Sequence, residues 1–186
     1  MNSEYTIAYV GLGSNLGDRA GNLLLAVRGL TEASFNVHKL SAIYETEPHE
    51  MESDVNFLNM VAEIHVASVS ASQMMARLLR IESLLGRKYK NLKKPRTVDL
   101  DILLFGDIRM ETEFLTLPHP RMHKRKFVLC PLAEIAPDLI HPVLHVKMSE
   151  LLANCEDICE SKRWNPNAHI PHELLQETVD ETIVKS

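Results

Sequence analysis

The strongest periodic signal in this sequence lies at residues 57–66, FLNMVAEIHV, where apolar side chains occupy every second position. Alternation of this kind places one set of side chains on one face of a β-strand and the intervening set on the other face. The segments 5–10 and 97–105 are also rich in apolar residues, and 35–44 has an extended pattern. The sequence therefore predicts strands in all four stretches.

Helical spacing of apolar residues separates these strands. Residues 19–30 carry leucines and a valine three or four positions apart, which predicts an amphipathic helix. Ser70 and Gln73 have the spacing of a capping box, and they predict a helix that begins there and ends at Gly86. Two further helices are predicted in the C-terminal half, after residue 124 and over 148–155.

The mixed order of strands and helices indicates the fold class. Gly106-Asp107 directly follows a predicted strand and has the composition of a two-residue hairpin turn. Such an order favours an α+β sandwich with a mostly antiparallel sheet over a doubly wound sheet. We expect a single domain over residues 1–160 and a polar C-terminal tail over 161–186, to which no role is assigned, because the periodic pattern fades there.

The bulk composition narrows the possible functions. With 186 residues, 45% of them hydrophobic and 24% charged, the chain suits a globular domain with a substantial core. A formal net charge of -5 weighs against a dedicated nucleic-acid binder, which is usually basic, and no apolar run is long enough to span a membrane. Three cysteines make no even disulfide framework. We therefore expect a cytoplasmic protein with no nucleic-acid or membrane partner.

The glycine-rich segment 9–19, YVGLGSNLGDR, raises the question of whether the chain cradles a phosphate at a helix N-terminus. The dinucleotide pattern fails because Leu16 stands where its third glycine belongs, and the P-loop pattern fails because Gly17 is followed by Asp18. Asp18 would repel a phosphate, but it suits a helix N-cap. We interpret the segment as a tight turn between a strand and a helix.

Two aspartates carry the first candidate chemistry. Asp99 and Asp101 lie two positions apart in an otherwise apolar strand. Period-two geometry puts both carboxylates on one face, with Cα atoms about 6.5–7 Å apart, and the two charges repel unless a cation lies between them. Magnesium binds one or two carboxylates together with substrate phosphates. The alternative is an exposed edge strand whose acidic side chains point into water.

Basic residues are concentrated next to this pair and in one later segment. The run from Arg87 to Arg96 holds six basic residues in ten positions, and PHPRMHKRKF at 118–127 holds four more. Either run alone is compatible with a solvated surface, but the two together favour a polyphosphate bound by arginines and bridged by metal to the aspartates. A nucleic-acid groove is the competing interpretation, although only Tyr89 and Phe127 offer stacking surfaces among these residues.

Six segments stand out over residues 5–145: GLGSNLGD, YETEP, NFLNMV, RIESLLGR, PRTVDLDILLFGD and LPHPRMHKRKFVLCPLAEIAPDL. In order and spacing they resemble the 6-hydroxymethyl-7,8-dihydropterin pyrophosphokinase family, whose members transfer pyrophosphate from ATP to a pterin alcohol. The resemblance implies a ferredoxin-like sandwich, ATP and 6-hydroxymethyl-7,8-dihydropterin as substrates, and two magnesium ions as cofactors in folate biosynthesis. It also implies that GLGSNLGD is a structural turn. We expect the enzyme to be a monomer.

The resemblance assigns roles in catalysis and ATP binding. Asp99 and Asp101 match the aspartates that hold the magnesium ions. Arg87 and Arg96 match arginines at the two ends of a catalytic loop that closes over the triphosphate. The remaining ATP-binding positions of the family correspond here to Glu82, Ile102, Thr116, His119 and Arg125.

The pterin-binding positions form a second group. Thr46 and Asn59 match residues that hydrogen-bond the edge of the pterin ring, and Phe57 and Phe127 match the aromatic pair that encloses it. Glu47 stands beside this pocket, at a position where some relatives have proline. The residues alone show that Phe57 and Asn59 share one strand face, so they could contact one ring or could both be ordinary core residues.

The sequence also departs from the family pattern. Lys93 and Lys94 stand where many relatives carry an aromatic and then a small residue, and this bears on how the catalytic loop closes. Two alternatives stay open at this point: a duplicated family member with an altered substrate, and a basic module that binds nucleotides or nucleic acid.

Overall fold

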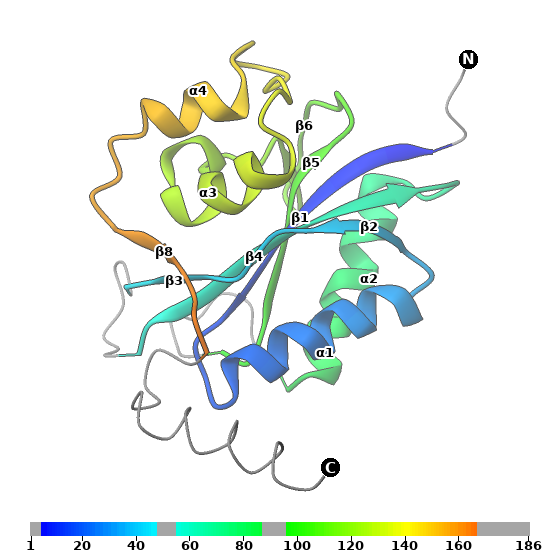
Figure 1. Cartoon of the computed structure of the whole chain (residues 1–186). Coiled ribbons are helices and arrows are strands. Elements are labelled where there is room, and N and C mark those ends of the chain that lie inside the picture. The colour runs from blue at the N-terminus through cyan, green and yellow to red at the C-terminus, as the bar shows by residue number, and fades with distance from the viewer. Residues whose placement is uncertain (1–4, 48–54, 87–95, 167–186) are drawn as a thin grey trace, which may run out of the picture.

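The computed structural model describes residues 5–47, 55–86 and 96–166. A six-stranded antiparallel sheet crosses the molecule, and helices cover both of its faces (Figure 1). The strands are β1 (Thr6–Ser14), β2 (Asn36–Leu40), β3 (Tyr44–Thr46), β4 (Phe57–Val66), β5 (Asp99–Phe105) and β8 (Ser161–Arg163), and a separate hairpin holds β6 (Met110–Glu111) and β7 (Thr116–Leu117). The helices are α1 (Arg19–Glu32), α2 (Ala71–Leu84), α3 (Lys126–Ile135), α4 (Met148–Ala153) and the short 3-10 helix Met122–Lys124.

The order of the strands defines the topology. The sheet runs β5-β1-β4-β3-β8, and β2 pairs with another part of β4. All of these pairings are antiparallel. Helix α1 connects β1 to the β2 and β3 side of the sheet, and α2 connects β4 to β5. This is the βαββαβ arrangement of a ferredoxin-like sandwich, so the predicted fold class is confirmed.

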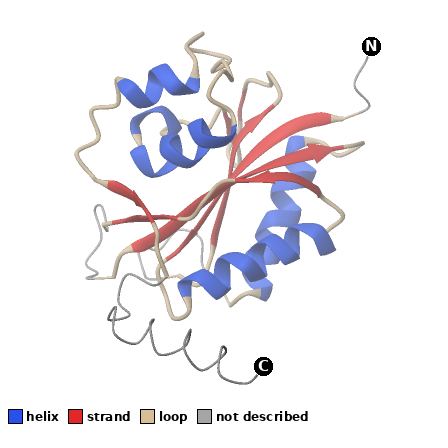
Figure 2. Ribbon diagram, viewed as in Figure 1, coloured by secondary structure: helices blue, strands red, loops and turns tan. Residues whose placement is uncertain are grey.

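Apolar residues on both faces of the sheet explain the two helical layers (Figure 2). On one face, Leu58 and Ile64 of β4 are buried in a core shared with Leu23 of α1 and Leu78 of α2. On the other face, Val61 of β4 is buried in a second core to which α3 and α4 contribute. Among the described residues, no helix combines the length and apolar character that a membrane crossing requires.

Two helix starts agree with the sequence. The Asp18 carboxylate accepts a hydrogen bond from the Gly21 backbone N–H over 2.9 Å, as an N-cap does. Ser70 and Gln73 form the complete capping box, with backbone-to-side-chain hydrogen bonds in both directions. Gly86 follows α2 with a φ of 94°, a conformation that glycine adopts without steric cost. The three capping predictions are confirmed.

Two local predictions are wrong. β1 continues through Gly11 and Gly13 to Ser14, because β4 pairs with it along that whole stretch, so only residues 15–18 make the turn. Gly106 does turn the chain with a φ of 52°, but β6 pairs with β7 rather than with β5. The expected hairpin at residues 106–107 does not form, because the later segment at His119 donates its backbone N–H to Leu103 of β5 instead.

The sheet extends past the boundary that the sequence suggests after residue 160. Strand β8 pairs with β3, and the Trp164 backbone N–H donates to the Ile43 carbonyl over 2.8 Å. The first residues of the predicted tail are thus part of the sheet, although their polar sequence gives no strand signal. Residues 167–186, the rest of that tail, lie outside the described residues.

Candidate functional site

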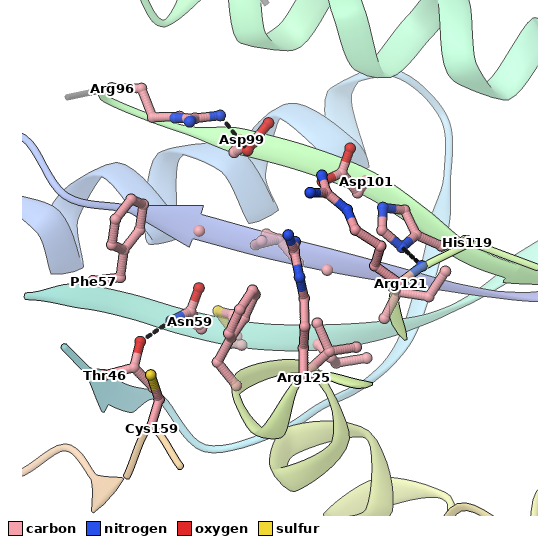
Figure 3. A pocket seen from close by; sticks show the side chains of 18 of the residues that line it. Thr46, Phe57, Asn59, Arg96, Asp99, Asp101, His119, Arg121, Arg125 and Cys159 are labelled. Carbon is pink, nitrogen blue, oxygen red and sulfur yellow. Dashed lines mark hydrogen bonds and ion pairs between the residues drawn. The ribbon is translucent and has the colours of Figure 1, made fainter. Parts of the chain in front are cut away.

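A pocket of about 220 Å³ opens on the face of the sheet that carries α3 (Figure 3). Strands β1, β3, β4 and β5 contribute lining residues, as do the start of α3 and the segment before it. The pocket is lined by ten of the residues predicted for catalysis or binding: Thr46, Glu47, Phe57, Asn59, Arg96, Asp99, Asp101, His119, Arg125 and Phe127. Side chains from distant parts of the sequence therefore meet in one cavity.

The acidic side of the pocket comes from β5. Asp99 and Asp101 both line it, whereas Leu100 between them is fully buried on the opposite face, as the alternation predicted. Arg96 donates from Nη1 to Oδ2 of Asp99 over 2.6 Å, and these two side chains are 18% and 23% exposed. The two carboxylates thus face a polar cavity beside a guanidinium rather than open solvent.

Two glycines of β1 keep the space beside these aspartates open. Gly11 pairs with Asp101 and Gly13 pairs with Asp99 in the β1–β5 register. A Cβ at Gly13 would lie 3.1 Å from Oδ1 of Asn59, closer than most real Cβ contacts. Because neither glycine has a side chain, β1 leaves the floor of the pocket free between the acidic strand and β4.

The turn that follows these glycines positions Arg96. Asn15 is buried, and its Oδ1 accepts a hydrogen bond from the Arg96 backbone N–H over 2.8 Å. The Asn15 backbone N–H donates in return to the Arg96 carbonyl over 3.2 Å. This two-way contact fixes the backbone at Arg96 next to Asp99. The glycine-rich segment therefore has a structural role, as the resemblance implied, and it acts on a residue of the pocket.

Glu82, which the resemblance placed near the nucleotide, lies behind the strand that bears the aspartates. Its side chain is buried beneath β5 and is not among the residues lining the pocket. The carboxylate accepts a hydrogen bond from the Leu100 backbone N–H over 2.7 Å. Glu82 thus holds the strand at the residue between the two aspartates, which fixes the backbone that carries them.

The basic side of the pocket comes from the segment before α3. His119, Arg121 and Arg125 all line it (Figure 3). Burial lowers the pKa of His119, and the two arginines lower it further against the opposing charge of Asp101, so the imidazole is neutral near pH 7. Nδ1 accepts the Arg121 backbone N–H over 3.3 Å, which leaves the proton on Nε2. A neutral donor and two cations therefore lie near the aspartates.

The third side of the pocket combines aromatic and neutral polar groups. Asn59 donates from Nδ2 to the Thr46 hydroxyl over 2.9 Å, and both residues are buried. Phe57 and Phe127 line the same region, and the Arg125 guanidinium carbon lies 5.3 Å from the centre of the Phe127 ring. Flat apolar surfaces next to an ordered amide are suited to a heteroaromatic ring with a hydrogen-bonding edge.

Two other predicted residues that the structure describes, Ile102 and Thr116, do not line the pocket. The Ile102 side chain is buried in the core, and Thr116 lies in β7. Arg87, Lys93 and Lys94 lie outside the described residues.

Sequence reasoning missed other lining residues, which include Gly11, Gly13, Arg121 and Cys159. The basic run at 118–127 contained the signal for Arg121, although that residue was not selected. No sequence pattern indicated that Cys159 would lie in this pocket.

A second polar cluster lies at the far end of β4. Glu63 accepts hydrogen bonds at Oε2 from the Tyr9 hydroxyl over 3.2 Å and from Lys39 over 3.3 Å, and His65 Nε2 lies 3.3 Å from Oε1. Together with His38, Glu63 and His65 form the one group of three potential metal ligands found in the described part of the chain. The two imidazoles are stacked with centroids 4.2 Å apart and planes 24° apart, so their in-plane lone pairs do not converge on one ion. We interpret the cluster as structural.

This cluster gives a prediction on pH-dependent stability. Burial raises the pKa of Glu63, but hydrogen bonds from His65, Lys39 and Tyr9 outweigh burial and leave the pKa below its usual value of 4.5. A carboxyl whose pKa is lower in the folded state stabilises the fold above the unfolded pKa, and that contribution is lost as the pH falls through the folded pKa. Glu63→Gln is therefore expected to flatten the decline in unfolding free energy below about pH 4.5.

Urea unfolding measured between about pH 7 and pH 3 tests this prediction. Glu32→Gln is the matched control, because Glu32 is exposed on α1 and pairs only with Arg28 of the same helix among the interactions seen here. A pH profile of Glu63→Gln that parallels the wild-type profile would show that Glu63 does not couple folding to protonation.

Comparisons with known proteins identify the family of this chain. The family model of 7,8-dihydro-6-hydroxymethylpterin-pyrophosphokinase (HPPK) matches residues 9–137. The 2-amino-4-hydroxy-6-hydroxymethyldihydropteridine pyrophosphokinase of Bacillus subtilis is 49% identical over 130 residues, which cover 69% of this chain and 77% of that protein. The enzyme of the same name from Aquifex aeolicus is 37% identical over 142 residues, covering 76% of this chain and 88% of that protein.

Solved structures agree on the fold. A crystal structure of HPPK-DHPS in complex with substrates superposes with a TM-score of 0.65 at 13% identity, covering 81% of this chain and 43% of that chain. Wild-type Plasmodium falciparum HPPK-DHPS with pteroate gives a TM-score of 0.65 at 16% identity, covering 82% and 45%. The chain thus spans less than half of these solved chains. From the extent of the family match and the identity to two relatives, the chain belongs to the 7,8-dihydro-6-hydroxymethylpterin-pyrophosphokinase family.

Proposed function

We propose that this pocket transfers pyrophosphate from ATP to 6-hydroxymethyl-7,8-dihydropterin, the reaction of the family in folate biosynthesis, with AMP as the second product. The observation that carries the proposal is the meeting of three sets of groups in one cavity. A carboxylate pair, four basic side chains and an aromatic pocket with a buried amide all line it. Each set matches one part of the two substrates: the bridging cation, the triphosphate and the pterin ring.

Magnesium is part of this proposal. Asp99 and Asp101 supply hard oxygen ligands on one strand face, and the glycines of β1 leave the space in front of them without side chains. That donor set fits a magnesium ion better than a soft metal, because no thiolate or imidazole lies in the strand that bears them. When bound, magnesium would neutralise charge on the phosphate oxygens and hold them in a reactive orientation. A role for two ions rests on the family resemblance alone.

The basic residues would hold the triphosphate. Arg96 Nε is buried and has no hydrogen-bond partner among the described residues, so it can donate to a phosphate oxygen while Nη1 stays on Asp99. His119 can donate from Nε2 without carrying a charge, and Arg121 and Arg125 add two cations. Transfer requires the pterin hydroxymethyl oxygen to lie in line with the β-phosphorus and AMP to leave. Positioning and charge neutralisation account for most of the catalysis in such reactions.

The proposal is tested by the products. The protein, supplied with ATP, magnesium and 6-hydroxymethyl-7,8-dihydropterin, is expected to form AMP and the pterin diphosphate in equal amounts, measured by chromatography and mass spectrometry. ADP as the product would indicate a simple kinase. Absence of turnover, together with binding of oligonucleotides that weakens steeply with salt, would favour the nucleic-acid interpretation.

The pterin side of the pocket gives a further prediction. Asn59→Ala and Phe127→Ala are each expected to weaken pterin binding by about 10- to 100-fold, because a buried hydrogen bond or ring contact contributes about 1–3 kcal/mol. ATP binding is expected to change by less than about threefold, since neither side chain carries a charge that would attract phosphate. Asn59 also lies on β4, which β1 separates from the aspartates of β5 (Figure 3).

Pterin fluorescence titrations, carried out with and without a non-hydrolysable ATP analogue, measure both affinities. Phe114→Ala is the control, because Phe114 is 83% exposed and lies in the turn between β6 and β7. Unchanged pterin affinity in folded Asn59→Ala and Phe127→Ala would remove these residues from the pterin site.

A further inference from the structure

The segment that follows α4 runs beside the pocket and closes one edge of the sheet. Strand β8 pairs antiparallel with β3, with Ser161 opposite Thr46 and Arg163 opposite Tyr44 (Figure 1). Thr46 is one of the lining residues of the pterin side. All of this segment lies beyond residue 137, where the match to the family model ends.

Asp157 ties this segment to the start of α3. Its Oδ2 accepts the Lys126 backbone N–H over 2.9 Å, and its Oδ1 accepts the Cys159 backbone N–H over 3.0 Å. No residue of α3 supplies a side-chain cap at that helix end, so Asp157 takes the place of an N-cap from a distant part of the chain. Because Phe127 follows Lys126 directly, one carboxylate sets the position of Cys159 relative to a lining residue of the pocket.

Glu134 provides a second connection further along α3. Its carboxylate accepts the Ala42 backbone N–H over 2.9 Å and pairs with the Arg163 guanidinium over 3.1 Å. The segment is therefore joined to α3 at two points and to β3 by strand pairing. These contacts hold it as a fixed wall of the cavity.

Cys159 is the residue of this segment that lines the pocket, and Figure 3 shows its side chain next to Thr46. Burial raises the pKa of the thiol, and the charges of Asp157 and Glu47 raise it further, so the side chain is uncharged at neutral pH. A small neutral group can approach the edge of a flat heteroaromatic ring without a desolvation cost for charge.

We propose that residues 157–163 form a wall of the pterin side of the pocket and that Cys159 limits the space beside Thr46 that the pterin ring can occupy. The inference rests on the proposed function, because it takes the ligand at this side to be the pterin. A segment outside the family match thus takes part in substrate selection. It does so through the size of the Cys159 side chain and has no part in catalysis.

Substitutions of different size test the proposal. Cys159→Leu is expected to weaken binding of 6-hydroxymethyl-7,8-dihydropterin by about tenfold or more, because the larger side chain fills space that the ring needs. Cys159→Ala is expected to retain affinity within about threefold. Binding of the non-hydrolysable ATP analogue is expected to stay unchanged in both variants. Ile158→Phe is the matched control, since Ile158 is 88% exposed beside Cys159.

Substrate protection gives a readout that does not depend on the folding of a variant. In the wild-type protein, 6-hydroxymethyl-7,8-dihydropterin is expected to slow alkylation of Cys159 by N-ethylmaleimide, as followed by peptide mass spectrometry. Alkylation of Cys155, which does not line the pocket, is expected to keep its rate.

The outcomes separate this inference from the proposed function. Wild-type affinity for the pterin in Cys159→Leu, or equal alkylation of Cys159 with and without the pterin that the protein binds, would overturn the inference and leave the proposed function standing. Failure of the wild-type protein to bind the pterin at all would overturn both.

Discussion

Asp99→Asn and Asp101→Asn are each expected to lower the rate of AMP release by about 100-fold or more, with the fold retained. Each substitution removes a charged oxygen ligand from the pair that faces the triphosphate side of the pocket. Amide oxygen is a weaker ligand for magnesium than carboxylate oxygen, and the phosphate charge is then less well neutralised. The measurement is the steady-state rate of AMP formation at saturating ATP, magnesium and pterin.

The same two variants are informative about stability. Like charges on one strand face repel, so neutralising one of them relieves an unfavourable interaction in the metal-free protein. Asp99 also loses its ion pair with Arg96, which at about one-fifth exposure contributes on the order of 1 kcal/mol or less. These effects oppose one another, and we expect the midpoint of thermal unfolding to move by only about 5 °C or less.

Asp107→Asn is the control for both measurements. Asp107 is exposed and lies just beyond the other end of β5, so the substitution changes the net charge by the same amount away from the pocket. Rates near the wild-type value in both aspartate variants would show that the pair has no catalytic role. A large loss of stability that accompanies the loss of rate would identify the pair as structural instead.

The elements that could be predicted from the sequence were those with a strong local signal. The alternation over residues 57–66 predicted β4 with its bounds, and the Ser70–Gln73 spacing predicted the start of α2. The same period-two rule placed Asp99 and Asp101 on one face of β5, opposite the buried Leu100. In each case the physical cause acts between neighbours in the sequence, so the pattern is visible without the fold.

The features that could not be predicted depend on contacts between distant segments. Asn15 reads as an ordinary turn residue, and only the fold shows that it holds the backbone of Arg96. Glu82 looks like a polar helix position, but it is buried because its carboxylate accepts the Leu100 N–H. Strand β8 has a polar sequence, and it forms because β3 offers it an unpaired edge. None of these partners is near in sequence, so no local pattern identifies them.

The pocket combines the two kinds of feature. The aspartates and the basic run indicated a phosphate site from the residues alone, whereas the roles of Thr46, Asn59 and Phe127 were expected only from the family resemblance. The structure brings all of them into one cavity. Their individual roles stay predictions, and the Arg96 side chain offers the sharpest test of how the cavity works.

Arg96→Ala is expected to lower kcat by about 100-fold or more while weakening ATP binding by less than about fivefold. In the free protein the guanidinium is already held by its Nη1 contact with Asp99, and two contacts with Asn15 hold the Arg96 backbone. A donor held in this way stabilises charge that develops during transfer without having to move when that charge appears. Two other cations, Arg121 and Arg125, line the pocket, so the loss of Arg96 leaves most of the attraction for ground-state ATP.

Steady-state kinetics and a separate titration with a non-hydrolysable ATP analogue distinguish the two effects. Arg96→Lys keeps the charge but lacks the planar guanidinium, which can donate to Asp99 and to a phosphate oxygen at the same time. Relative to Arg96→Ala, we therefore expect Arg96→Lys to recover the ATP affinity but little of kcat. Arg28→Ala is the control, because Arg28 is exposed on α1 and away from the pocket. If Arg96→Ala lowers kcat and ATP affinity by the same factor, Arg96 contributes to binding alone. If neither changes, the ion pair with Asp99 has only a structural role, and the charge on the transferred group must be stabilised by His119, Arg121 and Arg125.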